Sequence, residues 1–268
     1  MNAGMGPKSP RPPDTDEVLL LAADSARIVL ESGGETYRAE ETAGAFASSL
    51  GGVEVECFAM PTGIVMSFVG PDGRIHSIMR RVGARSLNFG RIALIETLSR
   101  DLYSGRLDYE GAAAALDGIE RLAERPLAIS LLAAAAGTGF FTLFFGGAWN
   151  DALVAAIIGA LLSRMVRYLA RRRISDFFTN LVGGAFIVLV TLAAARFGIA
   201  SSADLTIIGA AMYLVPGVAI TNAIRDTISG DLVAGVARSA DAFMAAAGIS
   251  IGAGSAFELW RLLGGGAA

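Results

Sequence analysis

The residues best suited to chemistry lie close together between Tyr213 and Asp231, where the sequence reads YLVPGVAITNAIRDTISGD. Asn222 precedes Arg225 by three residues and Asp226 by four, so one face of a helix can present all three side chains. A guanidinium group binds a carboxylate through two hydrogen bonds. An aspartate beside it can hold the guanidinium group in place or carry a proton. These residue types favour a binding site for a small solute with a carboxylate group.

Pro216 and Gly217 interrupt an apolar stretch just before these polar side chains. Proline lacks the backbone N–H, and its ring clashes with the carbonyl four residues earlier, here that of Met212, so we expect a kink or break. Within a bilayer the freed carbonyl needs a partner or a wet cavity. Broken helices beside polar groups are typical of substrate sites in transporters. The candidate substrate-binding residues are Tyr213, Pro216, Gly217, Thr221, Asn222, Arg225 and Asp226, with Asn180 from an earlier apolar segment.

The same residues also have a plainer interpretation. Pro216 can make an ordinary helix kink, and Arg225 and Asp226 can form an ion pair at a membrane boundary. Polar residues inside a membrane are functional by default, whereas charges at its boundary are not. The residues by themselves leave both interpretations open.

The elements that must position these residues fall into two halves of different composition. Residues 1–125 hold 13 Lys/Arg and 18 Asp/Glu, whereas residues 126–268 hold 9 and 7. A hydrophobic fraction of 53% and a mean hydropathy of +0.55 are typical of a membrane protein. The net charge of −3 gives no indication of a nucleic-acid partner. We therefore expect a soluble first half and a second half that lies in the lipid bilayer.

The second half contains five apolar segments of about the length that crosses a hydrocarbon core, which takes roughly 20 residues. These segments are 126–150, 152–170, 177–195, 205–224 and 242–260. They predict an α-helical membrane bundle of about five transmembrane helices in residues 126–262. Arginines concentrate in the loops after the second and fourth segments, which the positive-inside rule assigns to the cytoplasm. We expect a multi-pass protein of the inner or plasma membrane, with its N-terminal domain in the cytoplasm and its C-terminus outside.

The first half predicts a small α+β domain over residues 16–125. Helical periodicity covers 16–31, 35–50, 87–104 and 108–124. Strand patterns at 53–60, 63–69 and 74–82 are separated by turns that contain Pro and Gly, which indicates a three-stranded antiparallel meander. The proline-rich residues 1–15 are predicted to form a disordered leader. No apolar region follows their positive charges, so we do not expect a signal peptide.

Chemistry within the soluble domain is the competing possibility. Cys57 is the sole cysteine and His76 the sole histidine of the chain. A nucleophile pair is conceivable, although a buried cysteine and a surface histidine are the more ordinary interpretation. Acid/base groups or metal ligands are also conceivable among Glu31, Glu35, Glu40 and Glu41, but most such runs are solvated helix faces. The sequence has no Walker motif and no HExxH motif, so we expect neither a cofactor nor a metal.

Three blocks of the sequence resemble the threonine/serine exporter family, in particular its shorter, split members. These blocks are SGGETYRAEET (Ser32–Thr42), MPTGIVMSF (Met60–Phe68) and VPGVAITNAIRDTISGDLVAG (Val215–Gly235). The resemblance extends from about residue 16 to residue 262. It adds a motif in the soluble domain to the candidate site, made of Ser32, Gly34, Glu35, Thr36, Pro61, Thr62 and Gly63.

The resemblance implies an exporter of small polar metabolites, such as threonine, serine or a dicarboxylate like succinate, driven by the proton gradient, rather than an enzyme. Full-length members carry a second membrane module of four to five spans, and this sequence stops at Ala268 without one. We therefore expect a separate small membrane protein as partner, and an oligomer. Gly248 and Gly252, in GxxxG spacing, predict close helix packing within the bundle or against that partner. The alternative is a membrane-anchored regulatory or hydrolase-like protein that acts through its soluble domain.

Overall fold

The structure is a computed structural model that describes residues 13–83, 86–123 and 126–264. The chain divides into two compact units. The first contains the residues up to Leu122 together with Thr221–Arg238, and the second contains Ala123–Ile220 and Ser239–Ala268. Most of the expected disordered leader, residues 1–12, lies outside the described residues. The segment Thr221–Arg238 is thus separated by about 100 residues of sequence from the rest of its own unit.

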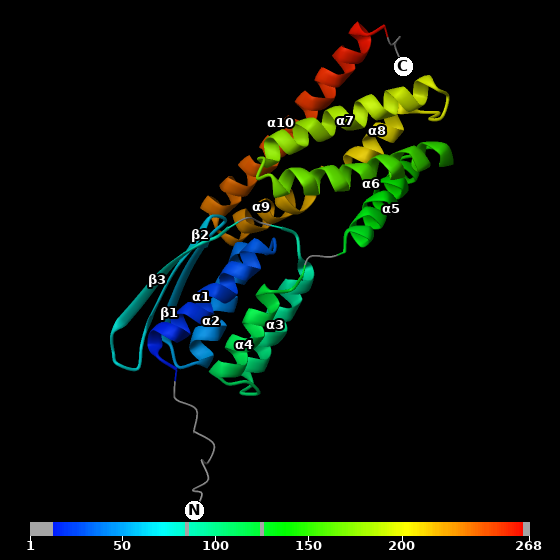
Figure 1. The fold of residues 1–268 in the computed structure, drawn as a ribbon. Coiled ribbons are helices and arrows are strands. Elements are labelled where there is room, and N and C mark those ends of the chain that lie inside the picture. The colour runs from blue at the N-terminus through cyan, green and yellow to red at the C-terminus, as the bar shows by residue number, and fades with distance from the viewer. Residues whose placement is uncertain (1–12, 84–85, 124–125, 265–268) are drawn as a thin grey trace, which may run out of the picture. The chain divides into compact units, whose positions relative to one another are not determined.

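The sheet of the first unit is a three-stranded antiparallel meander in the order β1-β2-β3 (Figure 1). Its strands are β1 (Val53–Met60), β2 (Gly63–Val69) and β3 (Ile75–Arg81). Across the sheet, Phe58 pairs with Val65, and Val65 pairs with Met79. These strands confirm the predicted meander to within one residue at each end, because alternating side chains and Pro-Gly turns are local signals.

Four helices accompany the sheet. They are α1 (Thr15–Glu31), α2 (Thr36–Ser49), α3 (Phe89–Tyr103) and α4 (Tyr109–Glu120). Helices α1 and α2 pack against the sheet, while α3 and α4 pack against these helices. The buried core between the layers includes Leu30, Phe46, Ile64, Met66 and Ile95. The side chain of Asp108 accepts a hydrogen bond from the backbone N–H of Gly111 and caps α4, as its position predicted.

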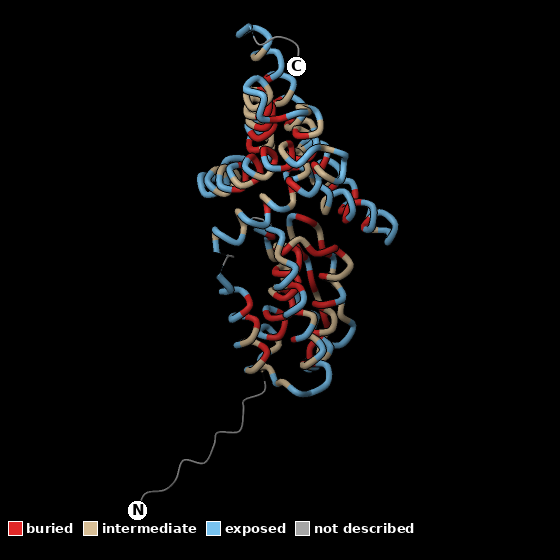
Figure 2. The backbone as a smooth tube through the Cα atoms, turned by 90° about the vertical axis from the view of Figure 1, so that its right-hand side faces the viewer, coloured by how far each residue is buried: buried red, intermediate tan, exposed pale blue. Residues whose placement is uncertain are grey.

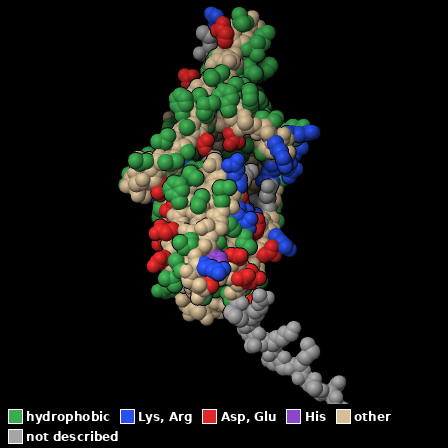
Figure 3. Space-filling model, turned by 90° about the vertical axis from the view of Figure 1, so that its left-hand side faces the viewer, with side chains coloured by type: hydrophobic (Ala, Val, Ile, Leu, Met, Phe, Trp, Pro, Cys, Tyr) green, Lys and Arg blue, Asp and Glu red, His purple; other side chains and the backbone are tan. Residues whose placement is uncertain are grey.

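Among the residues that the structure describes, four helices are long and apolar enough to cross a membrane. They are α5 (Leu127–Phe144), α6 (Trp149–Arg171), α7 (Asp176–Arg196) and α10 (Leu232–Leu262). Much of their surface is exposed, as the pale blue residues of Figure 2 show. Phe140, Phe144 and Trp149 are 69%, 80% and 81% exposed, and Figure 3 shows hydrophobic side chains gathered on the outside of this part of the molecule. Such apolar outer faces are suited to lipid, and the helices are those of a multi-pass membrane protein.

The apolar segment 205–224 is not one continuous helix. Helix α8 (Ala203–Ala211) ends before a turn at residues 212–214, and α9 (Gly217–Ser229) begins directly after Pro216. The break that Pro216–Gly217 predicted is confirmed: proline has no N–H to continue α8, and the carbonyl of Pro216 accepts the N–H of Ile220 at the start of α9 (3.0 Å). The described residues therefore contain four helices of spanning length rather than the five we predicted, because α8 and α9 are each too short.

The GxxxG glycines of α10 pack against α7 within the second unit. A Cβ atom on Gly248 would lie 2.8 Å from the carbonyl oxygen of Phe177, and one on Gly252 would overlap the carbonyl of Leu181. Gly184 of α7 lies equally close to the backbone of α10. These glycines thus serve packing inside the bundle, which was the plainer of the two interpretations.

Candidate functional site

The loop between α1 and α2 contains the Ser-Gly-Gly-Glu-Thr part of the predicted soluble motif. Gly33 has a φ of +85°, which glycine adopts without strain. The N–H of Gly34 donates to the carbonyl of Val29 (2.9 Å) and that of Gly33 to Leu30 (3.1 Å), which closes the end of α1 in a Schellman turn around the buried Ser32. This turn leaves the carbonyls of Gly33 and Gly34 available to other donors.

Asp226 of α9 lies at the N-terminus of α2. Glu35 occupies the N-cap position, but its side chain makes no capping hydrogen bond. Instead, Asp226 Oδ1 accepts the backbone N–H of Thr36 (3.2 Å), and Asp226 Oδ2 accepts the Thr36 hydroxyl (3.1 Å). A carboxylate at this place satisfies an unpaired amide and interacts favourably with the helix dipole. A residue 190 positions away in the sequence therefore caps α2.

Arg238, near the start of α10, forms an ion pair with the Asp226 carboxylate. Its Nε atom lies 2.8 Å from Asp226 Oδ2, and its Nη2 atom donates to the carbonyl oxygen of Gly34 (2.8 Å). The side chains of Arg238 and Asp226 are 6% and 0% exposed. Each of these two buried charges depends on the other, because an unpaired charge at this depth is costly. This ion pair is the centre of the site.

Asn222 and Arg225 of α9 reach the same loop. Asn222 Nδ2 donates to the carbonyl oxygen of Gly33 (2.9 Å), and Arg225 Nη1 lies 2.5 Å from Glu35 Oε1. Asn222, Arg225 and Asp226 therefore share one face of α9, as their spacing predicted. That face binds residues 33–36 of the soluble motif, within one compact unit.

Glu35 is shared between two arginines. Burial alone raises the pKa of its carboxyl group, but a hydrogen bond from its own backbone, a hydrogen bond from Arg225 and the charges of Arg38 and Arg225 lower the pKa below its ordinary value overall. Arg38 Nε lies 3.2 Å from Glu35 Oε2. The Arg225 side chain is 54% exposed, whereas that of Glu35 is 11% exposed. Arg225 is therefore the accessible cation of the site, already paired with an internal carboxylate.

Two further carboxyl groups near Asp226 hold their protons more tightly than usual. Burial raises the pKa of Glu40, and the charges of Asp231 and Asp226 raise it further. Burial and the charge of Asp226 likewise raise the pKa of Asp231. Glu40 Oε1 also accepts the N–H of Ala59 (2.8 Å), which fixes it beside β1. These two groups remain protonated to higher pH than an exposed carboxyl group does.

The remaining predicted residues lie elsewhere. Pro61 and Thr62 form the turn between β1 and β2, and Gly63 is the first residue of β2. The carbonyl of Thr62 accepts the N–H of Val82 (3.2 Å), and these three residues make none of the hydrogen bonds around Asp226. Thr221 is exposed on α9 in the first unit. The second unit contains the other four, which are Asn180, Tyr213, Pro216 and Gly217.

The competing nucleophile pair does not form. Burial and the charge of Glu40 raise the pKa of the Cys57 thiol to about 12, so it carries little thiolate at neutral pH. His76 is instead bonded by two aspartates, with Nδ1 3.0 Å from Asp16 Oδ1 and Nε2 3.2 Å from Asp72 Oδ1. Across the described part of the chain, no group of His, Cys, Asp and Glu side chains could hold a metal ion.

The sequence did not identify Arg238 as the partner of Asp226 in this site. The sequence places it in the loop after the fourth apolar segment, because the last predicted span begins only at residue 242. It belongs to α10 and lies in a run of small residues, VAGVARSADA at 233–242. A charge in such a helix requires a partner, and that requirement is the signal that could have pointed to Asp226.

Comparisons with known proteins match most of the length of this chain. The family model for threonine/serine exporters matches residues 21–260. A threonine/serine exporter of Mycobacterium tuberculosis (strain H37Rv) is 29% identical over 243 residues, which cover 89% of this chain and 45% of that protein. The threonine/serine exporter of Corynebacterium glutamicum is 25% identical over 253 residues, which cover 92% and 52%. The chain thus spans about half the length of the curated relatives it matches. No solved structure is significantly similar to it.

Proposed function

Because the chain belongs to the threonine/serine exporter family, we propose that it is one subunit of a secondary exporter of small polar metabolites. The exported solutes are threonine- or serine-like amino acids or a dicarboxylate such as succinate, and the proton gradient drives their export. The other part is a small membrane protein of four to five spans. The chain spans about half the length of the curated relatives it matches.

The observation that carries the proposal is the ion pair between the exposed Arg225 and the internal carboxylate of Glu35. A solute carboxylate replaces Glu35 on Arg225, and the exposed Thr221 hydrogen-bonds another polar group of the solute. Asn222, which is buried and donates to the carbonyl of Gly33, holds the loop beside the solute. Asp226 positions this site rather than binding solute, because its side chain is 0% exposed and already holds α2 and α10. Glu35 therefore acts as an internal substitute for the solute when the site is empty.

The path through the bilayer involves the break between α8 and α9. Pro216 and Gly217 open the backbone there, and Tyr213 and Asn180 supply polar side chains to the pathway. In this arrangement α8 and α9 together make a fifth, interrupted crossing. The N-terminal domain then lies in the cytoplasm and the C-terminus outside, as the distribution of arginines favours.

Coupling to protons requires a group that binds and releases a proton. The raised pKa values of Glu40 and Asp231, both influenced by the charge of Asp226, support a role for this group of carboxylates. A proton bound here weakens the repulsion among these carboxylates. Protonation thereby changes how firmly Asp226 holds the loop between α1 and α2.

Export of labelled threonine, serine and succinate from cells that make this chain, with and without a candidate small membrane partner, tests the proposal. Arg225→Ala should abolish export while the amount of folded protein in the membrane stays the same. Arg121→Ala is the matched control: it removes an exposed arginine that pairs with Asp117 at 2.9 Å, and export should be unchanged. Glu35→Gln frees Arg225 and should lower the solute concentration that gives half-maximal export.

Two outcomes would contradict the proposal. Normal export by Arg225→Ala would remove the carboxylate-binding role from this residue. No export of any of the three solutes, with folded wild-type protein and the partner present, would overturn the assignment of these substrates and would favour a membrane-anchored protein that acts through its soluble domain.

A further inference from the structure

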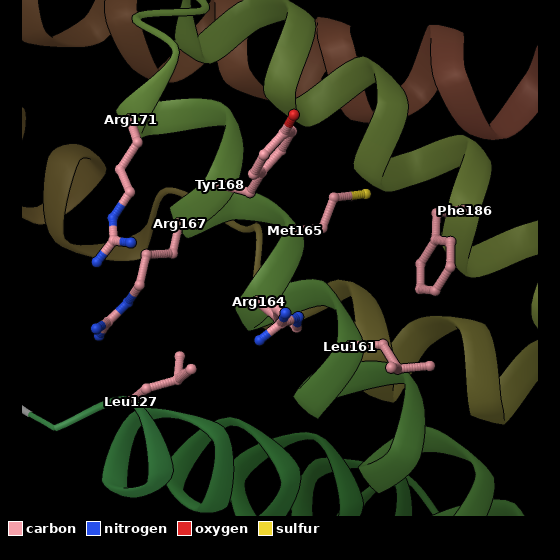
Figure 4. A pocket seen from close by; sticks show the side chains of 8 residues that line it. All are labelled: Leu127, Leu161, Arg164, Met165, Arg167, Tyr168, Arg171 and Phe186. Carbon is pink, nitrogen blue, oxygen red and sulfur yellow. The ribbon is translucent and has the colours of Figure 1, made fainter.

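A second site lies in the second unit, along one side of α6. A pocket of about 490 Å³ opens there between α5, α6 and α7 (Figure 4). Its volume is within the range of small-molecule sites, roughly 300–1,000 Å³. Three arginines and a tyrosine supply its polar lining, and the other lining residues that the structure describes are apolar.

The cationic side chains of the pocket are Arg164, Arg167 and Arg171. Arg167 Nη2 donates to the Ser130 hydroxyl of α5 (2.7 Å), which fixes this guanidinium group beside the pocket. Within the described ranges, the guanidinium groups of Arg164 and Arg171 make no hydrogen bond or ion pair. Among the described residues, the pocket therefore offers two arginines without an ion-pair partner beside a third whose guanidinium group is held in place.

Two of the three arginines of the pocket, Arg167 and Arg171, lie at one end beside Leu127, and the other end is apolar (Figure 4). Arg171 is the last residue of α6, which is a candidate membrane span. Leu161 lies ten residues earlier, about 15 Å along the helix axis, and Phe186 comes from the middle of α7. Figure 4 shows Arg167 and Arg171 extending on one side of the pocket and Leu161 and Phe186 on the other. The gradient of polarity thus runs from the end of the span toward its interior.

We propose that this pocket binds the headgroup phosphate of an anionic phospholipid. Guanidinium groups bind phosphate through paired, charge-assisted hydrogen bonds, and basic pockets between spans are suited to anionic headgroups. The first part of an acyl chain then lies along Leu161 and Phe186. A small soluble anion would neutralise the arginines but would leave the apolar end of the pocket against water, so the mixed lining favours a lipid.

Native mass spectrometry of the purified full chain tests this proposal, with phosphatidylglycerol or phosphatidylcholine of the same acyl chains added to the detergent. We expect wild-type protein to retain phosphatidylglycerol in preference to phosphatidylcholine. The double variant Arg164→Gln/Arg171→Gln should retain at least about fivefold less phosphatidylglycerol. The control Arg196→Gln/Arg261→Gln removes the same charge from residues outside the pocket and should retain as much as wild type.

Equal retention by the wild type and the Arg164→Gln/Arg171→Gln variant would overturn the proposal. Binding of inorganic phosphate or succinate that the double variant loses, without any preference for phosphatidylglycerol, would assign the pocket to a soluble anion and would also overturn it. Wild-type protein in bilayers with photoreactive phosphatidylglycerol provides a measurement that does not depend on variant folding. Crosslinks in peptides that contain residues 161–171 support the proposal, and crosslinks confined to other peptides contradict it.

Discussion

Replacement of Asp226 by asparagine should release the first turn of α2, more than 180 residues away in sequence. The wild-type carboxylate accepts two hydrogen bonds from Thr36 and pairs with the buried Arg238. Removal of one partner of a buried ion pair costs about 3–5 kcal/mol. Asparagine retains one acceptor, and Arg238 keeps its bond to the carbonyl of Gly34, so we expect the lower end, about 3 kcal/mol.

Hydrogen exchange of the full-length protein in detergent measures this effect directly, because the Thr36 amide is itself one of the donors. A factor of ten in an equilibrium corresponds to about 1.4 kcal/mol. A loss of about 3 kcal/mol therefore predicts exchange roughly a hundredfold faster in peptides that cover residues 33–42. The matched control is Asp117→Asn, which loses an exposed ion pair and should change exchange there by less than about threefold.

The pairwise origin of the effect is checked with Arg238→Gln. If Asp226 and Arg238 depend on each other, the double variant Asp226→Asn/Arg238→Gln should cost less than the sum of the single variants by at least about 1 kcal/mol. Wild-type protection of residues 33–42 in Asp226→Asn would refute the reasoning, because the cap and the ion pair would then contribute nothing to the stability of this loop.

Three further predictions concern burial and close packing. Ionisation of Glu40 costs stability as pH rises from the ordinary value of 4.5 through its raised pKa. Glu40→Gln keeps an acceptor for the N–H of Ala59, so the melting temperature of the variant at pH 7 should be at least that of the wild type. Near pH 4 the two melting temperatures should be equal. Cys57, with a pKa of about 12, should react with iodoacetamide at pH 8 about 10³-fold more slowly than a free thiol, and labelling of folded protein at the free-thiol rate would contradict its burial. Gly252→Ala should destabilise the protein in detergent by about 1–3 kcal/mol because its Cβ would overlap the α7 backbone, whereas Gly254→Ala, which faces open space, should be tolerated; equal melting temperatures would refute the packing.

Local signals in the sequence were sufficient for the secondary structure of the N-terminal domain. The meander and the four helices of residues 16–125 follow from side-chain periodicity and from turns such as Pro61-Thr62-Gly63, which depend on neighbouring residues alone. The break before Gly217 was predictable for the same reason, because the missing N–H of Pro216 is a property of that residue. The shared face of Asn222, Arg225 and Asp226 required only the helical repeat.

The number of membrane spans could not be predicted from local signals. Hydropathy predicted a crossing over 205–224, but hydropathy measures composition and not continuity. The turn at 212–214 divides that segment into two short helices. Conversely, the last helix extends to Leu232 on its N-terminal side, beyond the most apolar residues, because small residues and a paired arginine allow the helix to continue.

What the sequence alone determined about this protein is its class, most of its elements and the residue types of its candidate site. Only the tertiary structure shows which side chains of the site bind one another. Asp226 caps a helix that begins at Thr36, and Arg225 meets Glu35 rather than an empty space. Pairings across about 190 residues leave no periodic trace in one sequence, since they depend on how packed elements bring distant charges together. Burial then makes such pairs obligatory, because a charge removed from water must find its counterpart.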